Sequence, residues 1–123
     1  MGSRFSNRYR NQHSVQQHTP RTMVLRPYDI HWVELGDQIQ RPFVILSPVE
    51  MNAHLSHVLA APLSSQGQQW PTRVVLDEWD FHSEVALEGL CRIDKKQVLG
   101  RMARLNALAI RQVKAVLKEM LVD

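Results

Sequence analysis

The sequence predicts one small domain that is mainly β, an antiparallel barrel or curled sheet closed by a single C-terminal α-helix. Three observations support this fold class. Short alternating or apolar segments separated by turn signals recur from residue 29 to residue 93. No helical segments alternate with them, so the βαβ pattern of a parallel sheet is absent. Residues 106–121 then change to the spacing of an amphipathic helix.

The first 22 residues differ in composition from the rest of the chain. They are rich in Arg, Asn, Gln, Ser and His and contain few aliphatic residues. Such a segment cannot bury enough apolar surface to offset the entropy lost on ordering. We therefore expect residues 1–22 to be a flexible basic tail and residues 23–123 to be the folded domain. The tail either contacts nucleic acid or only aids solubility, and the sequence leaves both open.

Two strands open the predicted domain. Residues 29–35 alternate polar and apolar side chains, which is the period of a half-buried strand. Gly36-Asp37 follows as a turn signal. Residues 43–46 form a continuous apolar run that is short and bounded by prolines, so a buried strand fits this run better than a helix.

The middle of the chain predicts one helical turn and two further strands. Residues 48–52 begin with proline, which favours the first position of a helix. Residues 57–63 read as a third strand, and residues 64–71 read as a polar loop. Residues 72–76 are rich in β-branched side chains and predict a fourth strand.

The last part of the chain predicts a fifth strand and the terminal helix. Residues 85–93 form that strand, in which Gly89 marks a bulge or a close backbone approach. Asn106 is a good N-cap for the helix. The side chains expected to face the core recur at spacings of three and four, and they are Ile110, Val113, Leu117 and Leu121.

Composition excludes several classes of protein. The single cysteine, Cys91, rules out an internal disulfide framework. No apolar run approaches the roughly 20 residues that a membrane-spanning helix needs. The N-terminus lacks the apolar core of a signal peptide. We therefore expect a cytoplasmic protein with no membrane association.

The net charge of +3 is unevenly distributed. Five of the 15 Lys and Arg residues lie in residues 1–26, which contain no acid, so residues 27–123 carry 10 basic and all 12 acidic residues. Basic residues concentrate between Arg92 and Lys118, and acidic ones between Asp77 and Glu88. Such a dipolar domain either guides a polyanion to one face or only solvates the surface.

Most general catalytic motifs are absent. The sequence contains no glycine-rich phosphate loop and no Gly-x-Ser-x-Gly elbow. His54-x-x-His57 is the only close histidine pair, and no third ligand with recognisable spacing accompanies it. Cys91 lies within a predicted strand and reads as a small core residue rather than as a nucleophile. We therefore expect no metal site and no cofactor.

Arg41 and Ser64 lie at the ends of two neighbouring predicted strands. Arg41 opens the second strand, and Ser64 ends the third. If these strands pair antiparallel, the start of one lies beside the end of the other, so both side chains meet at one edge. A guanidinium fork and a hydroxyl suit a phosphate group. Alternatively, Arg41 pairs with a surface acid and Ser64 caps a turn.

Several segments in this order carry a resemblance to a known family. They are Arg26, Asp29-Ile30, Trp32-Val33, Leu35, Arg41-Pro42-Phe43-Val44-Ile45-Leu46-Ser47-Pro48, Asn52, Ala61-Pro62-Leu63-Ser64-Ser65, Ile93-Asp94-Lys95-Lys96 and Leu99-Gly100-Arg101-Met102. Together they resemble the PemK/MazF toxins over roughly residues 25–121. The strand that begins with Arg-Pro and ends with Ser-Pro is the most specific part.

The resemblance implies a fold, an activity and partners. It implies an SH3-like barrel that forms a homodimer, cleaves single-stranded RNA without a metal, and is neutralised by a cognate antitoxin. In this chemistry a ribose 2′-oxygen attacks the adjacent phosphate. The reaction needs a base for that hydroxyl, an acid for the leaving 5′-oxygen and a cation beside the crowded phosphorane.

The resemblance also suggests which residues act. Arg41 matches the arginine that holds the phosphate, and Ser64 matches the threonine of a Thr-Ser pair. Glu88 falls where some members have an acidic residue, which serves as base or as an RNA contact. These three residues are the expected catalytic set. The expected RNA contacts are Asp37, Gln40, Ser65, Gln66 and Arg92.

Two alternatives remain open at this stage. A CcdB-like poison has the same general barrel but binds DNA gyrase and cleaves nothing. A non-catalytic barrel kept for antitoxin binding is the other alternative. The short loop at residues 36–40 favours this second alternative, because the family usually carries polar catalytic residues in a longer loop there.

Overall fold

The computed structural model describes residues 23–77 and 83–122. The flexible tail expected at residues 1–22 lies outside the described residues. Within the described part of the chain, no helix is both long enough and apolar enough to cross a membrane.

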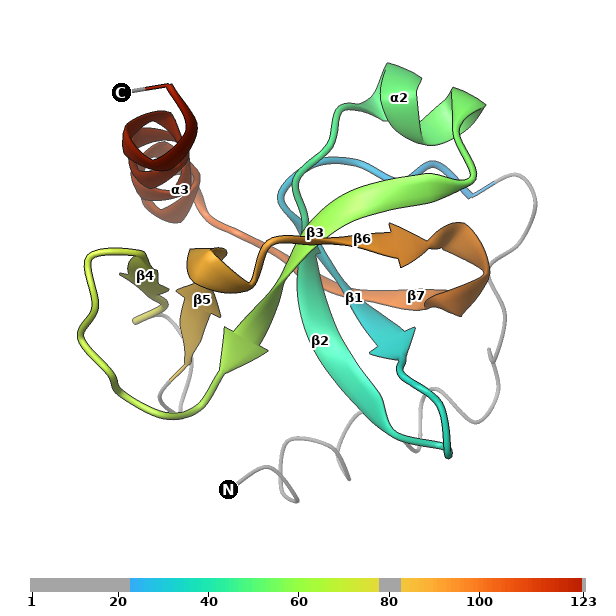
Figure 1. Ribbon diagram of the computed structural model, residues 1–123, viewed down its shortest axis with the longest axis horizontal. Helices are drawn as coiled ribbons and strands as arrows, with labels where there is room; N and C mark the ends of the chain where they lie inside the picture. Colours follow the sequence, from blue (N-terminus) through green and yellow to red (C-terminus); the bar gives the residue numbers. More distant parts are fainter. Residues whose placement is uncertain (1–22, 78–82, 123) are drawn as a thin grey trace.

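The described chain is built mostly of short strands, with one long helix at its end (Figure 1). In chain order the elements are β1 (Asp29–Glu34), β2 (Gln40–Ile45), α2 (Val49–His54), β3 (His57–Ser64), β4 (Arg73–Val75), β5 (Glu84–Ala86), the 3-10 turn η1 (Leu87–Gly89), β6 (Cys91–Asp94), the 3-10 turn η2 (Lys95–Gln97), β7 (Val98–Arg104) and α3 (Ala107–Leu121).

The described strands form a single seven-stranded sheet in the order β4-β5-β3-β2-β1-β7, with β6 paired to β3 off this path. Every neighbouring pair is antiparallel. This confirms the predicted class, a mainly β antiparallel fold with a C-terminal helix. The path ends at β4 on one side and at β7 on the other, so barrel is an approximate description of this open sheet.

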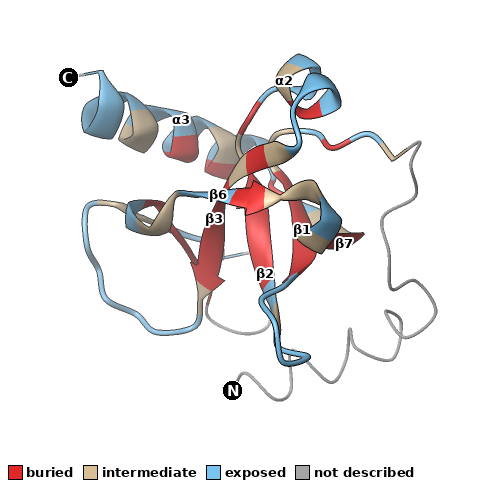
Figure 2. Ribbon diagram, turned by 45° about the vertical axis from the view of Figure 1, so that its right-hand side comes forward, coloured by how far each residue is buried: buried red, intermediate tan, exposed pale blue. Residues whose placement is uncertain are grey.

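The central strands are buried on both faces (Figure 2). Val44 packs into a cluster that includes Val113 of α3, whereas Phe43 and Ile45 pack into a second cluster with Val58. Successive side chains of a strand point to opposite faces, so the two clusters lie on the two sides of β2. Burial on both faces explains the continuous apolar run that the sequence shows here.

The fifth predicted strand is wrong as a single element. Residues 85–93 divide into β5, η1 and β6, and these pair with different parts of β3. Pro62, which has no N–H for a ladder, lies in the gap between the two pairings. A Cβ added to Gly89 would lie 3.0 Å from Cγ and Cδ of Pro62, so the close approach expected at Gly89 is confirmed.

Strand β7 was not among the strands that the sequence predicts. It pairs with β1 through a register that shifts twice, between Ile30 and His31 and between His31 and Val33. Its burial changes from three buried residues to four that are exposed or half-buried. Such irregularities erase the period of two that identifies a strand in a sequence.

Helix α3 begins where the sequence predicts. Asn106 Oδ1 accepts a hydrogen bond from Ala109 N at 2.8 Å, which confirms the N-cap. Val113 is fully buried against the sheet, and Ile110 and Leu117 are partly buried. Leu121 is 66% exposed, so the prediction that it faces the core is wrong. The helix continues beyond the sheet that covers its earlier turns (Figure 2).

A buried polar cluster holds α2 in place. Asn52 Nδ2 donates to the carbonyl oxygens of Leu25 at 2.8 Å and Ser47 at 2.9 Å. Ser47 Oγ donates to Asn52 Oδ1 and accepts from Leu59 N at 3.0 Å. These bonds explain why a serine ends the second strand and an asparagine follows five residues later. Their role is structural.

Candidate functional site

Arg41, near the start of β2, and Ser64, at the end of β3, lie at the same end of these two strands, which form the Arg41 edge. The printed pairs of β2 and β3 run from Ile45 opposite Ala60 to Phe43 opposite Pro62, and Arg41 and Ser64 each lie two residues beyond the last of them. The Arg41 guanidinium donates from Nε at 3.4 Å and from Nη2 at 3.2 Å to the carbonyl oxygen of Leu63. These hydrogen bonds hold the Arg41 guanidinium next to the residue that precedes Ser64.

The guanidinium of Arg41 keeps donors available for a ligand. Its side chain is exposed, and no carboxylate of a described residue pairs with it. The alternative in which it binds a surface acid is therefore not what the described residues show. Ser64 Oγ accepts a hydrogen bond from Gln66 N at 3.2 Å, so this hydroxyl does cap a turn. Its own proton remains available for a phosphate oxygen.

Two charged residues that the sequence reasoning missed adjoin this edge. Glu84 of β5 lies opposite Ser64 and is fully buried. Arg73 of β4 donates from Nη1 to Glu84 Oε1 at 3.0 Å and to the carbonyl oxygen of Gln66 at 3.3 Å. Arg73 thus connects the sheet to the loop that follows Ser64. The signal available in the sequence was a charged residue beside valines in each of two short segments, Arg73 in one and Glu84 in the other.

Glu88 is held by the same arginine. Its Oε2 lies 2.6 Å from Nη2 and 2.7 Å from Nε of Arg73, and its Oε1 accepts from Thr72 Oγ1 at 2.7 Å. Burial raises the pKa of Glu88, but hydrogen bonds from Arg73 and Thr72 outweigh it and leave the pKa below its ordinary value. Glu88 therefore carries a fixed negative charge near neutral pH.

Asp37 in the loop between β1 and β2, and Gln40 as the first residue of β2, lie at the same end of the sheet as Arg41. Leu35 N donates to Ile39 O at 2.8 Å, which closes the loop tightly. Gly36, Asp37 and Gln38 all have positive φ, at 98°, 50° and 63°. Gln40 pairs with Glu34 and directly precedes Arg41.

The remaining predicted RNA contacts divide into near and distant ones. Ser65 and Gln66 are exposed and follow Ser64 directly. Arg92 is exposed on β6, opposite Leu59. Leu59 precedes Ser64 by five residues of an extended strand, so Arg92 lies roughly 17 Å from that end of β3. The structure does not bring Arg92 to the edge formed by Arg41 and Ser64.

Two further expectations concern metals and Cys91. Among residues 23–77 and 83–122, no three His, Cys, Asp or Glu side chains are grouped so that they could hold a metal ion. Cys91 is exposed, so its expected place in the core is wrong. Desolvation raises the pKa of its thiol, which disfavours the nucleophilic thiolate.

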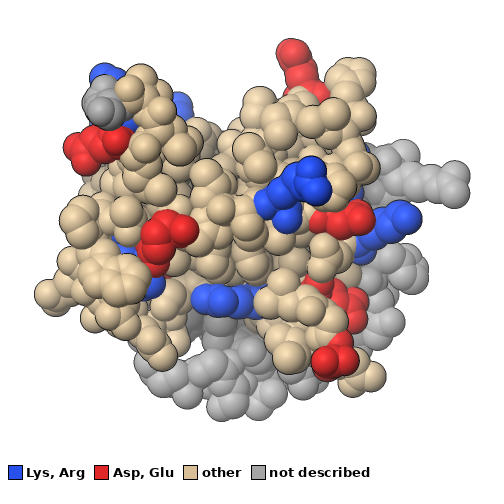
Figure 3. Space-filling view, in the orientation of Figure 1, with Lys and Arg blue, Asp and Glu red and all other residues tan. Residues whose placement is uncertain are grey.

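Charges of both signs are scattered over the face shown in Figure 3, and most of that face is uncharged. The view contains no broad surface of a single sign. Local groups, rather than a general electrostatic field, must therefore supply most of the attraction for an anion on this face.

Comparison with known proteins extends this picture. A family model described as PemK-like, MazF-like toxin of type II toxin-antitoxin system matches residues 26–121. A search of curated proteins found no match.

Solved structures share the fold at low sequence identity. A MazF crystal structure from Deinococcus radiodurans is 20% identical with a TM-score of 0.69, covering 80% of this chain and 97% of that one. An endoribonuclease from a mycobacterial species is 17% identical with a TM-score of 0.71, covering 80% and 92%. A mycobacterial endoribonuclease in complex with its cognate antitoxin is 18% identical with a TM-score of 0.71, covering 78% and 93%.

The family match spans both the sheet and α3, and it includes the edge formed by Arg41 and Ser64. The chain belongs to the family of PemK-like, MazF-like toxins of type II toxin-antitoxin systems.

Proposed function

We propose that this toxin is an endoribonuclease that cleaves single-stranded RNA. The observation that carries the proposal is the exposed Arg41 guanidinium, which is bonded to the carbonyl oxygen of Leu63, the residue before Ser64. Members of the same fold that have been solved include proteins named as endoribonucleases. The family resemblance implies a reaction that needs no metal.

The reaction proposed is an internal transfer at phosphorus. The 2′-oxygen of a ribose attacks the adjacent phosphorus, the bond to the 5′-oxygen breaks, and that oxygen takes up a proton. The products are a 2′,3′-cyclic phosphate and a 5′-hydroxyl. Arg41 donates charge-assisted hydrogen bonds to the phosphate oxygens, which gain negative charge as the phosphorane forms. Ser64 donates one further hydrogen bond to the same group.

Glu88 has two candidate roles, and its surroundings favour one of them. A general base works best with a pKa near the working pH. The pKa of Glu88 is lowered, and both of its oxygens accept hydrogen bonds from Arg73 and Thr72. We therefore assign Glu88 to an RNA contact, where a fixed carboxylate accepts hydrogen bonds from base amino groups.

The other proposed contacts surround the Arg41 edge. Asp37 flanks it from the loop before β2, Gln40 is the first residue of β2, and Ser65 and Gln66 flank it from the loop after β3. Arg92 contacts RNA farther along the same molecule. Asp37 is the exposed carboxylate nearest in sequence to Arg41, so Asp37 is the residue to examine for the base.

The partners follow from the family and from one solved relative. A mycobacterial endoribonuclease of this fold was solved with its cognate antitoxin. We propose that the present toxin also binds a cognate antitoxin, forms a homodimer and acts in the cytoplasm.

The short loop at residues 36–40 favours a second candidate, a non-catalytic barrel that only binds the antitoxin. An RNA-cleavage assay distinguishes the endoribonuclease from the non-catalytic barrel. Wild-type protein incubated with a long single-stranded RNA in EDTA should cut it, and Arg41→Ala should reduce cutting by about a thousandfold because it removes the cation at the phosphorane. Arg111→Ala, on the exposed face of α3, is the matched control and should cut normally. Intact RNA together with retained antitoxin binding would establish the second candidate.

A further inference from the structure

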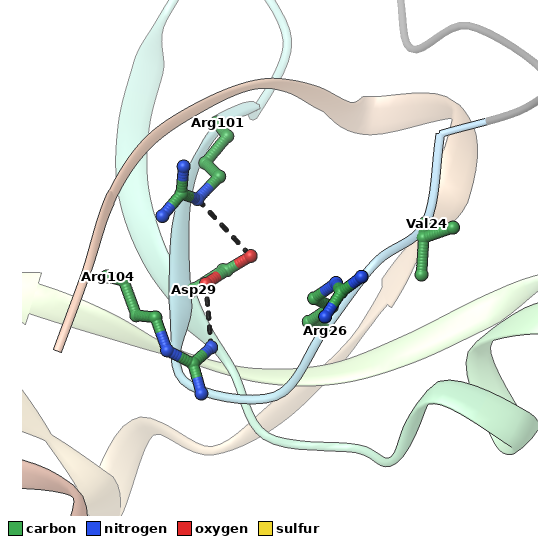
Figure 4. Close-up of a pocket in the computed structure, with 5 residues that line it drawn as sticks. All are labelled: Val24, Arg26, Asp29, Arg101 and Arg104. Carbon is green, nitrogen blue, oxygen red and sulfur yellow. Dashed lines mark hydrogen bonds and ion pairs between the residues drawn. The ribbon is translucent and has the colours of Figure 1, made fainter. Parts of the chain in front are cut away.

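A pocket on the β1 and β7 side of the molecule is surrounded by arginines. Its volume is about 460 Å³, and it is lined by Val24, Arg26, Asp29, Arg101 and Arg104. Figure 4 shows the three guanidinium groups placed around the single carboxylate of Asp29. Neither the family match nor the Arg41 edge assigns a function to these residues.

The contacts in this pocket leave positive charge unbalanced. Asp29 is 4% exposed, its Oδ1 lies 2.9 Å from Arg104 Nη1, and its Oδ2 lies 3.3 Å from Arg101 Nε. Arg104 also donates to the carbonyl oxygen of Pro27 at 3.1 Å. The backbone carbonyl oxygen of Arg26 accepts a hydrogen bond from Asp29 N at 3.3 Å, but the Arg26 guanidinium makes no hydrogen bond or ion pair with a described residue. Three cations thus surround one anion, which leaves a net charge of about +2.

Neutralising Asp29 does not require all three arginines. A buried carboxylate with an arginine on each oxygen is already satisfied. Arg26 adds a further positive charge next to two others, and like charges at this range repel. The terminal nitrogens of Arg101 make no hydrogen bond or ion pair with the described residues, so they remain available as donors. An oxyanion bound in this pocket would balance the excess positive charge and accept hydrogen bonds from the free donors.

We propose that this pocket binds a phosphate group. The three guanidiniums come from two separate segments, the stretch before β1 and strand β7, and they face the hollow from different sides (Figure 4). A tetrahedral phosphate presents oxygens in several directions and accepts from several such groups. A carboxylate, by contrast, has only two coplanar oxygens, and one guanidinium group can bind both of them. The geometry therefore suits phosphate better than an acidic side chain.

The pocket is separate from the Arg41 edge. Val33 pairs with Arg41, and Asp29 precedes Val33 by four residues of β1. Four extended residues and one strand spacing separate the backbones of Asp29 and Arg41 by on the order of 14 Å. At this separation the pocket and the Arg41 edge can each bind a different phosphate group. The phosphate is either one in the backbone of a bound RNA, which rests on the proposed function, or a free phosphate, which does not.

The first arm of the test uses inorganic phosphate and requires no RNA. NMR of the arginine Nε–Hε groups should show saturable shifts as phosphate is added. Arg26→Gln should weaken the apparent affinity at least about tenfold, because it removes charge-assisted hydrogen bonds. This variant should fold, since the Arg26 side chain has no hydrogen-bond or ion-pair partner among the described residues and the substitution keeps its backbone carbonyl. Arg111→Gln, an exposed arginine on α3, is the matched control and should bind phosphate as the wild type does.

The second arm uses a non-cleavable single-stranded RNA with 2′-O-methyl riboses. If a backbone phosphate occupies the pocket, the slope of log K against log salt should become shallower by about 0.7 in Arg26→Gln, the value for one phosphate on a single strand. The slope should not change in Arg111→Gln. An effect in the RNA arm identifies the RNA backbone as the source, and an effect in the inorganic arm alone identifies a free phosphate.

The proposal is overturned if neither arm distinguishes Arg26→Gln from Arg111→Gln. Binding of an acidic peptide at this pocket without any phosphate effect also overturns it. Neither arm depends on RNA cleavage. A toxin that does not cleave RNA would refute the proposed reaction, but the phosphate-binding result could still be interpreted.

Discussion

At the scale of single residues, Arg73 is the side chain on which most other contacts near the candidate site depend. Its side chain is 9% exposed, and that of its partner Glu84 is 1% exposed. It also lies 4.8 Å from the ring centroid of Trp70 and binds the carbonyl oxygen of Gln66. Arg73 therefore positions the loop after Ser64 from β4, although β5 lies between β4 and β3 in the sheet.

A double-mutant cycle tests this ion pair. Arg73→Met should lower the free energy of unfolding by about 3 kcal/mol, because it leaves the carboxylate of Glu84 buried without this partner. Combining Arg73→Met with Glu84→Gln should recover part of that loss, since the uncompensated charge is then removed. Urea denaturation of the four proteins measures the coupling. Strictly additive effects would contradict a direct interaction between the two side chains.

His31 is a second residue whose burial has a measurable consequence. It is 1% exposed, and its Nδ1 lies 2.9 Å from the carbonyl oxygen of Leu99. Its Nε2 has no hydrogen-bond partner among the described residues. Burial lowers the pKa of His31 below 6.5, although the Leu99 carbonyl and Asp29 partly oppose this. The folded protein thus holds a neutral imidazole.

This lowered pKa makes stability depend on pH in a defined direction. Above pH 6.5 the ring is neutral in both the folded and the unfolded chain, so its contribution is constant. Below that value the unfolded chain takes up the proton first, and stability falls until the folded pKa is reached. His31→Asn keeps a donor for the Leu99 carbonyl and cannot titrate. Urea midpoints between pH 7 and pH 5 should therefore fall less in His31→Asn, and parallel curves would contradict the explanation.

The sequence predicted some of the candidate site and missed the rest for a physical reason. Arg41 and Ser64 could be brought together because a short connection between two strands implies antiparallel pairing. Arg73 and Glu84 could not, because strands of three residues are too short to show a period. Arg92 was placed by resemblance, and only the pairing of β6 with β3 shows its distance from the edge.

At the scale of elements, β2 and α2 illustrate how a motif can be structural and functional at once. The apolar part of β2 fills both cores, and Ser47 with Asn52 attaches α2 to the sheet. Lys95 Nζ adds a hydrogen bond to the carbonyl oxygen of Asn52 at 2.6 Å. Only Arg41, at the exposed start of β2, remains free for chemistry.

The buried Asn52 offers a matched comparison with an exposed asparagine. Asn52→Ala should lower the free energy of unfolding by about 2 kcal/mol, because it leaves buried carbonyl and hydroxyl groups without partners. Asn106→Ala removes only the N-cap of α3 and should cost about 1 kcal/mol. Thermal or urea denaturation compares them. An equal or smaller loss for Asn52→Ala would contradict the structural role of this cluster.

The elements that the sequence missed are those whose pattern is interrupted. Residues 85–93 are predicted as one strand with a bulge or close approach at Gly89, but the chain turns at η1, where Gly89 meets Pro62. Strand β7 escaped detection because bulges interrupt its pairing with β1. The patterns place β1 and α3 at the right residues, but β1 is buried at five of its six positions, so its prediction as a half-buried strand is wrong.

At the scale of the whole molecule, the open sheet separates two groups of cations. Arg41 lies on the β2–β3 edge, and the three arginines around Asp29 lie on the β1–β7 side. The predicted antiparallel fold is confirmed, whereas the open path β4 to β7 follows from strand pairings that no local pattern encodes. The division of charge along the chain does not indicate Arg41, whereas Arg101 and Arg104 of the pocket fall within the basic stretch between Arg92 and Lys118.

The central claim is that this toxin cleaves RNA through its 2′-hydroxyl at the Arg41 edge. The most direct measurement is the chemistry of the new ends after wild-type protein has acted on single-stranded RNA in EDTA. The account predicts a 2′,3′-cyclic phosphate and a 5′-hydroxyl, and no cutting of the same strand made with 2′-O-methyl riboses. Intact RNA at high protein concentration, or products ending in a 3′-hydroxyl and a 5′-phosphate, would contradict it.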